Sequence, residues 1–341
     1  MDYIKGVDIS KREYFEILEN NFPIWLNEYI NTKEMLYLQY VSVSCGKIYS
    51  KMFNIKTNYN TLDHSIAVAL IVWHFTKDKK QTLAGLFHDI STPVFKHCVD
   101  FMNGDYLKQE STESLTKTII HNSKEIMALL KRDNIKIGEV ADYHIYPIAD
   151  NETPKLSADR LEYSLSNSLF LYNIAKLEDV KQIYEDIEIQ RNENGEEELG
   201  FKTKNIARKF VSVTNKLSII YRDDNTRFSM QFLADIMKKL NNENLVTIDD
   251  LYQMKESEII DLIKNSKYKE VFSMWQNAKR VNISKEKPKD VYTVRIKAKV
   301  RYIDPLFQGK RISNQCKIAK KMIDKNFAFD MSNYLYLNFN F

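Results

Sequence analysis

The sequence predicts a mainly α-helical protein with one small β-hairpin and a short α+β region at its C-terminus. Of its 341 residues, 44% are hydrophobic and 12% are aromatic, which is more than a disordered chain contains. Only 8 glycines and 6 prolines are present, few for a β protein rich in turns. Apolar residues recur mostly at helical spacing, so we expect helices to form the core.

Helical spacing begins near the N-terminus and continues to about residue 175. The first apolar pattern runs from about Arg12 to Phe75, and Asp63 lies close to a helix start within it. The break at residues 91–93 ends in Pro93, a residue suited to the first position of a new helical turn that would reach His97. The other helices expected in this part cover residues 81–90, 113–131 and 155–175.

The apolar period changes in the second half of the chain. Residues 183–201 alternate on both sides of a turn sequence at 192–195 and predict a β-hairpin. Residues 291–302 alternate well enough to predict a strand, and residues 334–341 predict another. The helices expected here cover residues 203–221 and 230–240, with two short ones between residues 250 and 278.

We therefore expect two regions along the chain. Residues 1–285 would form a helical domain with its core at about residues 25–180, and residues 286–341 a small α+β region packed on it.

Composition also limits where the protein works and what it binds. The 50 basic and 46 acidic residues give a net charge of +4, so nucleic acid is not indicated as a main partner. Cys45, Cys98 and Cys316 show no CxxC spacing, which suits a reduced cytoplasm. The longest apolar run, residues 66–73, is far too short to span a membrane, so we expect a cytoplasmic protein without a membrane partner.

Four residues carry the strongest chemical signal. His64 is followed by the adjacent pair His88-Asp89, which comes directly after the apolar run 83–87, and Asp159 lies further along the chain. Imidazole nitrogens and carboxylate oxygens are ligands that divalent metal ions accept. Because the helical pattern can bring all four side chains together, we interpret them as a quartet around one metal ion.

This order of a His, a His-Asp pair and a distant Asp resembles the HD superfamily of metal-dependent phosphohydrolases. Pro93, Phe95 and His97 resemble the continuation of the pair in the deoxynucleoside triphosphate triphosphohydrolases, and DRLEY at 159–163 resembles their distal motif. The resemblance covers roughly residues 55–310. It implies an HD-domain helical bundle and hydrolysis of a nucleotide phosphoester, with (deoxy)nucleoside triphosphates as the favoured substrates.

Neighbouring residues would bind the substrate or assist the reaction. Arg160 is the first candidate for phosphate, because a guanidinium binds phosphate through two hydrogen bonds, and Lys96 is a weaker one. Tyr163 lies one helical turn from Asp159 and would contact a phosphate or stack on the base. His97 and Glu113 are candidates for proton transfer or for orienting a ligand.

Two imidazoles and two carboxylates suit Mn, Fe, Ni, Zn or Mg and leave the identity of the one divalent ion open. An ion that accepts six ligands would keep positions for water and a phosphate oxygen. The quartet is therefore consistent with hydrolysis of a phosphoester.

Three threonines depart from the resemblance. Thr61 stands where many triphosphohydrolases carry Arg, and Thr92 and Thr112 stand where they carry His. These departures favour one alternative, a phosphodiesterase or phosphomonoesterase acting on another nucleotide. An alternative from another class is a non-catalytic regulatory protein that binds nucleotides. Self-association into a homo-oligomer is expected from the resemblance alone.

Other charged residues have simpler interpretations. The alternating cations Arg295, Lys297, Lys299 and Arg301 are typical of the solvated face of a strand, with an anion-binding strip as the alternative. His74, His121 and His144 belong to no motif, and we expect them to be ordinary, partly buried imidazoles.

Overall fold

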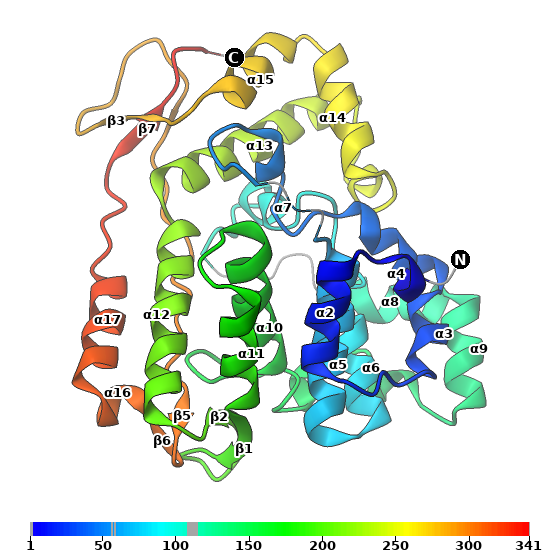
Figure 1. The fold of residues 1–341 in the computed structure, drawn as a ribbon. Coiled ribbons are helices and arrows are strands. Elements are labelled where there is room, and N and C mark those ends of the chain that lie inside the picture. Colours follow the sequence, from blue (N-terminus) through cyan, green and yellow to red (C-terminus); the bar gives the residue numbers. More distant parts are fainter. Residues whose placement is uncertain (1–2, 56, 58, 108–114, 341) are drawn as a thin grey trace.

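The computed structural model confirms that the protein is mainly helical, with a few short strands (Figure 1). It describes residues 3–55, 57, 59–107 and 115–340. The α-helices are α1 (Tyr3–Gly6), α2 (Ile9–Leu18), α3 (Leu26–Ile30), α4 (Lys33–Tyr37), α5 (Thr61–Thr76), α6 (Lys79–Phe87), α7 (His97–Met102), α8 (Thr116–Asn122), α9 (Lys124–Arg132), α10 (Ala158–Ser166), α11 (Leu177–Glu185), α12 (Lys204–Ile220), α13 (Asp224–Asn242), α14 (Glu256–Asn265), α15 (Lys269–Asn277), α16 (Ile312–Gln315) and α17 (Lys317–Phe327).

Short helical turns and strands complete the fold. The turns are η1 (Leu38–Tyr40), η2 (Lys47–Tyr49), η4 (Ile137–Glu139), η5 (Tyr143–Ile145), the π-helical η6 (Asn167–Leu171) and η7 (Asp249–Tyr252). The strands are β1 (Ile187–Arg191), β2 (Glu197–Phe201), β3 (Asn282–Ser284), β4 (Thr293–Val294), β5 (Leu306–Phe307), β6 (Lys310–Arg311) and β7 (Tyr334–Tyr336). One sheet has the order β1-β2-β5-β6, with β5 parallel to β2, and the other has the order β3-β7-β4.

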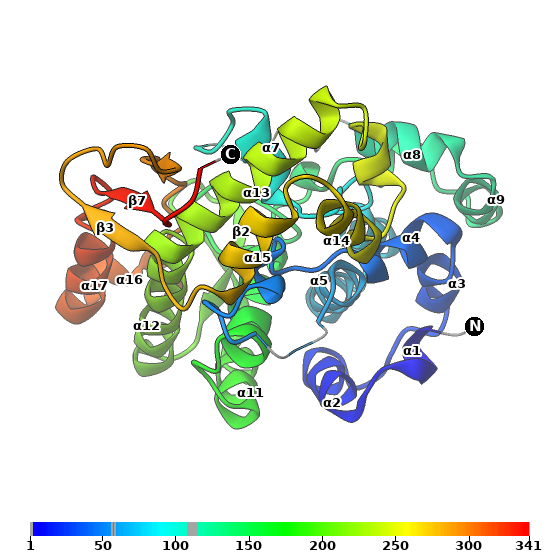
Figure 2. The ribbon, with the colours of Figure 1, turned by 90° about the horizontal axis from the view of Figure 1, so that it is seen from above.

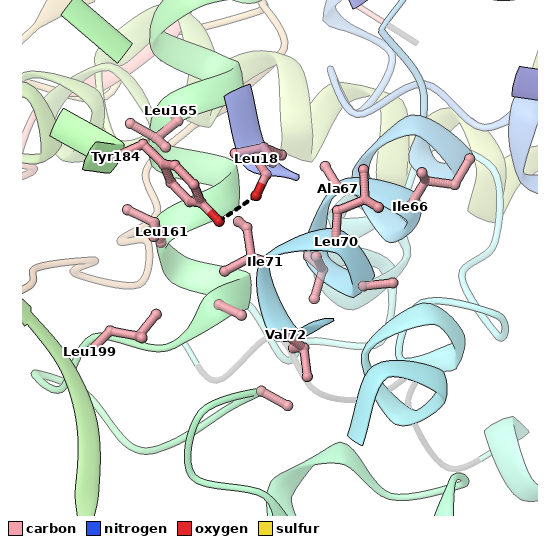
Figure 3. Packing of buried hydrophobic residues seen from close by; sticks show 14 of the residues in the cluster. Leu18, Ile66, Ala67, Leu70, Ile71, Val72, Leu161, Leu165, Tyr184 and Leu199 are labelled. Carbon is pink, nitrogen blue, oxygen red and sulfur yellow. Dashed lines mark hydrogen bonds between the residues drawn. The ribbon is translucent and has the colours of Figure 1, made fainter. Parts of the chain in front are cut away.

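Helix α5 forms the centre of the larger hydrophobic cluster. Its N-terminus is closed by a capping box, because Asn60 accepts from the Asp63 amide and Asp63 accepts from the Asn60 amide. Residues 61–72 are buried throughout, and α2, α6 and α10 pack around the helix. Figure 3 shows its apolar side chains beside Leu161 and Leu165 of α10. The first turn of α5 is therefore held rigidly in the core.

A second hydrophobic cluster joins α7, α13, α14 and α15 to the strands β4 and β7. These elements form the upper part of the molecule in Figure 1. In both ribbon views α16 and α17 lie on one side, and α3, α8 and α9 lie on the opposite side (Figures 1 and 2). The loop between α6 and α7 connects the two clusters, because Ile90 belongs to the first and Val94 to the second, where its amide donates to the Leu251 carbonyl at 2.8 Å.

Several predicted elements need correction. The hairpin exists, but β1 starts only at Ile187, because Ile183 and Tyr184 are buried on α11. Of the strand predicted at 291–302, only β4 pairs, with β7. In the described chain, residues 295–302 do not pair with another strand, although their polar and apolar side chains alternate as in a strand.

Two helix starts were also predicted wrongly. No helix begins at Pro93, because Phe95 and Lys96 have left-handed φ angles of 63° and 43°, and α7 starts at His97. The helix predicted at 113–131 is two helices in the described residues, separated at Ser123, whose side chain caps α9. Within the described residues, every helix is too short or too polar to cross a membrane.

Candidate metal centre and its cavity

His64 lies in the first turn of α5, where the core fixes its position. It is buried, and its Nδ1 bonds the carboxylate of Glu162. Because Nδ1 is engaged there, Nε2 points to the opposite side of the ring, towards His88, at 3.1 Å from that residue's Nε2. An acceptor on Nδ1 orients an imidazole for metal binding through Nε2.

His88 and Asp89 follow the C-terminus of α6, where the chain turns away from the helix. His88 Nδ1 bonds the Gly85 carbonyl at 2.7 Å, so this ring too presents Nε2. Both oxygens of Asp89 have donors: the Thr92 hydroxyl at 2.9 Å and the Lys96 ammonium at 2.7 Å. The turn therefore fixes the orientation of both side chains.

Asp159 completes the group from the start of α10, which Ser157 caps. Its Oδ1 lies 3.2 Å from His64 Nε2 and 3.7 Å from His88 Nε2. Asp89 Oδ2 lies 3.7 Å and 3.8 Å from the same two nitrogens. The structure thus brings together all four residues that the sequence singled out.

These separations fit ligands of one ion. Atoms held at about 2.1 Å from a metal are roughly 3.0 Å apart at right angles and roughly 3.4 Å apart in a tetrahedron. The candidate ligand atoms of His64, His88 and Asp89 all lie within 4.8 Å of one another, a group that could hold a metal ion. With both Nδ1 atoms bonded to acceptors, neutral imidazoles would direct two lone pairs at each other, an arrangement that a cation between them would stabilise.

The field at the quartet favours a positive charge. Burial alone would lower the pKa of His64, but Glu162, Asp159 and Asp89 outweigh it and raise the pKa to about 10. Burial acts to raise the pKa of Asp89, yet Lys96, His88 and His64 hold it well below its usual value. The pKa of Asp159 is likewise lowered against burial, mainly by the bond with His64. Both aspartates are therefore ionised near neutral pH.

Glu162 is the functional residue that the sequence did not assign a role. It is fully buried and accepts hydrogen bonds from the Tyr59 hydroxyl at 2.6 Å, the Tyr14 hydroxyl at 3.2 Å and the Ser166 hydroxyl at 3.2 Å, besides the His64 contact. These donors fix the carboxylate, which in turn fixes His64. Its position one turn after Asp159 in the DRLEY run was the available signal.

A cavity of about 260 Å³ opens beside the quartet. Its wall includes three residues predicted to bind substrate, Lys96, Arg160 and Tyr163, and also His97. The further polar and aromatic residues in the wall that the sequence did not assign to the site include Lys47, Tyr143, His144, Asn167, Tyr172, Tyr221, Lys299 and Arg301.

The predicted substrate residues already have protein partners. Arg160 bonds Asn151 at 2.6 Å through Nη1 and lies 3.5 Å from Asp150. Lys96 is paired with Asp89, and Tyr163 has the Arg301 guanidinium 5.9 Å from the centre of its ring. All three nevertheless face the cavity, so a substrate would share these groups.

His97 is bonded on both ring nitrogens. Its Nδ1 lies 2.9 Å from Asp100, and Nε2 accepts from Arg301 at 3.3 Å. Burial lowers the pKa of His97, and Arg301 lowers it further, so the ring is neutral near pH 7. Glu113, the other candidate for proton transfer, lies outside the described residues.

The three threonines are placed differently. Thr61 is buried and donates to the Val41 carbonyl at 2.9 Å, so its hydroxyl serves the backbone. Thr92 donates to Asp89 and supports the quartet. Thr112 lies outside the described residues. Of the cations at 295–301, Arg295 and Lys297 are exposed, whereas Lys299 and Arg301 line the cavity.

Three known proteins resemble this chain at low sequence identity. No protein-family model matches the chain. The uncharacterized protein YdhJ of Bacillus subtilis is 24% identical over 258 residues, which cover 75% of this chain and 76% of YdhJ. A hypothetical protein from Aquifex aeolicus has a similar structure, with a TM-score of 0.62 at 16% identity over 91% of both chains. A phosphohydrolase from Bacteroides thetaiotaomicron matches with a TM-score of 0.51 at 12% identity over 94% of both chains.

Proposed function

We propose that the protein is a metal-dependent phosphohydrolase that cleaves a phosphoester of a nucleotide. One observation carries this proposal: His64, His88 and Asp89 form a group that could hold one ion, and Asp159 Oδ1 lies 3.2 Å from His64 Nε2, beside a cavity lined with cations. The Bacteroides neighbour described as a phosphohydrolase and the motif resemblance to the HD superfamily point the same way.

The quartet and its supporting residues prepare the site for water and phosphate. A divalent ion held there would acidify a bound water and polarise a phosphate oxygen. Glu162 and the Gly85 carbonyl keep both imidazoles facing the ion, and Lys96 balances the charge of Asp89. Two aspartates offset a divalent ion, so an anionic substrate needs the additional cations of the wall.

The substrate class follows from those cations. Lys96, Arg160, Lys299 and Arg301 line one cavity, and several negative charges would match them. A (deoxy)nucleoside triphosphate is therefore our favoured substrate. Tyr163 lies beyond Asp159 on α10 and would contact the sugar or base, while His97 holds Arg301 through Nε2. Proton transfer by His97 and Glu113 stays a prediction.

A phosphodiesterase or phosphomonoesterase is the second candidate. Lys96 and Arg160 are already engaged with Asp89 and Asn151, and Thr61 serves the backbone, which leaves less positive charge for a triphosphate. Analysis of the product separates the two candidates, because intact tripolyphosphate, pyrophosphate or phosphate identifies the bond that breaks.

The test is a panel of nucleotides offered with Mn²⁺ or Mg²⁺ to the wild type and to Asp89→Asn, which keeps the shape of the side chain and removes its charge. We expect turnover in the wild type alone. Asp330→Asn, at an exposed carboxylate of the C-terminal region, is the matched control and should retain full activity. Equal turnover by Asp89→Asn would refute the function; tight binding of a nucleotide with metal and no product would instead favour a regulatory protein.

A further inference from the structure

Lys47 is a buried cation in the cavity wall. Its residue is only 5% exposed, and its ammonium donates to the Tyr172 hydroxyl at 2.9 Å. Three aromatic rings surround it, with centroids 5.7 Å away in Phe53, 5.6 Å in Tyr172 and 5.9 Å in Tyr221. Within the described residues, no carboxylate forms an ion pair with this ammonium, although Asp223 contributes to its field.

Lys11 provides the comparison. It is as deeply buried, at 4% exposure, and it pairs with Asp63 at 2.7 Å. A buried ammonium without an anionic partner loses much of its hydration energy and gains little in return. Burial acts to lower the pKa of Lys47, but Tyr172 and Cys45 keep it above its usual value, so the charge is retained. The position therefore suits a missing anion.

The backbone before Lys47 is bent to place it there. Cys45 and Gly46 have left-handed φ angles of 54° and 75°. A Cβ on Gly46 would lie 2.7 Å from a Leu233 atom and 2.8 Å from a Phe95 atom, so only glycine fits. Unfavourable backbone of this kind persists where the surrounding fold requires it and is frequent at ligand sites.

Tyr172, the hydrogen-bond partner of Lys47, lies well beyond the end of α10 that carries the quartet residue Asp159. Asp159 is at the start of this helix and Tyr172 thirteen positions later, after η6, which corresponds to about 20 Å along a helix axis. Tyr163 and Asn167 line the cavity between them. Along this part of the wall Asp159 therefore comes first, then Tyr163 and Asn167, and last Tyr172, to which Lys47 donates.

We infer that Lys47 binds a second anionic group of the substrate, a phosphate on the sugar of the nucleotide, at the end of the cavity remote from the quartet. This assignment rests on the proposed function, because it takes the phosphate that reacts to lie at the quartet. The phenols and the amide between the two ends suit a nucleoside better than a chain of phosphates. The substrate class would then narrow from nucleoside 5′-phosphates in general to those that carry a second phosphate at the 2′ or 3′ position.

Calorimetry tests the assignment with the full-length protein and Mn²⁺. The probes are adenosine and guanosine 5′-monophosphates, their 2′,5′- and 3′,5′-bisphosphates, and the 5′-triphosphates. A hydrogen bond from a charged group predicts that the wild type binds one of the bisphosphates about 10-fold or more tightly than the matching monophosphate. Lys47→Met should abolish that preference, whereas Lys51→Met, at an exposed lysine outside the cavity, should keep it.

Three results would overturn the inference. The wild type could bind mono- and bisphosphates equally, a comparison that needs no variant to fold. A Lys47→Met protein with an unchanged melting temperature could keep the preference. Finally, Lys47→Met could weaken binding of the triphosphate without changing binding of the bisphosphates, a result that would place the triphosphate chain at Lys47.

Chromatography of the titrated samples distinguishes this inference from the proposed function. If the protein prefers a bisphosphate but hydrolyses none of the probes, the anion site at Lys47 is supported and the proposed hydrolase function is refuted. If it hydrolyses a probe but shows no preference for a bisphosphate, the hydrolase function is supported and the site at Lys47 is refuted.

Discussion

Replacing Glu162 by glutamine should weaken metal binding through His64. The carboxylate accepts from the phenols of Tyr14 and Tyr59 on Oε1 and from His64 Nδ1 and Ser166 on Oε2. Glutamine keeps only one acceptor oxygen. If that oxygen serves the phenols, the amide group faces Nδ1, the imidazole proton moves to Nε2, and His64 can no longer bind a metal. If it serves His64, both phenols lose their acceptor.

Either arrangement has a measurable cost. Loss of the acceptor behind a metal-bound histidine lowers metal affinity by about 10-fold to 100-fold. An unsatisfied buried donor lowers the free energy of unfolding by about 1–3 kcal/mol. Competition with a chromogenic chelator for Mn²⁺ or Zn²⁺ measures the affinity, and urea denaturation of the metal-free protein measures the stability.

Glu19→Gln is the matched control. Glu19 is also buried and lies 3.5 Å from a histidine, His74, but it is not part of the cavity wall. Its replacement should leave metal affinity within about 2-fold, since it has no link to a ligand. Glu162→Gln should also matter less once His64 is replaced by glutamine, because the two residues act as a unit. Wild-type affinity in Glu162→Gln, or an equal loss in the control, would refute this reasoning.

Three further variants test the fold around the site. Burial raises the pKa of Glu256 to about 8, against about 4.3 in an unfolded chain. As the pH rises, the carboxyl group therefore ionises in the unfolded state before it does so in the folded state. The free energy of unfolding should fall between about pH 4 and pH 8, by at most about 5 kcal/mol. Glu256→Gln should remove that loss and unfold at higher urea than the wild type at pH 8; an unchanged difference between pH 5 and pH 8 would exclude the effect. Gly46→Ala, which adds a Cβ at a left-handed position with no space for it, should lower the free energy of unfolding by about 2 kcal/mol or more, and a loss below about 0.5 kcal/mol would be inconsistent with the packing. Lys11→Met leaves Asp63 as a buried carboxylate without its cation and should cost about 3 kcal/mol in urea denaturation, whereas the exposed control Lys238→Met should cost nearly nothing; similar values for both would show that the pair is unimportant.

The helical fold could be predicted because apolar spacing is a local pattern, and the approach of the four distant residues because they match a family motif. Apolar spacing gave α12 within one residue at each end and the start of α5 close to Asp63, but α13 begins at Asp224, six residues before the predicted start. The positions of His64, His88-Asp89 and Asp159 match a family motif, and the structure brings their side chains together. The left-handed backbone at Phe95 and Lys96 could not be predicted, since neither residue type favours it and the surrounding fold imposes it.

Roles that depend on tertiary contacts were missed. Lys47 resembles any other lysine in the sequence, and only the burial of its ammonium among aromatic rings distinguishes it. Thr92 seemed a loss of phosphate-binding capacity, whereas its hydroxyl donates to Asp89. The alternation at 291–302 predicted a strand, but only Thr293 and Val294 pair with another strand, and Lys299 and Arg301 line the cavity.

An anomalous difference map from a crystal grown with Mn²⁺ would test the quartet most directly. We predict one strong peak within about 2.0–2.3 Å of Nε2 of His64, Nε2 of His88 and one oxygen each of Asp89 and Asp159. A peak that omits these four side chains, or none between them at saturating Mn²⁺, would contradict the assignment.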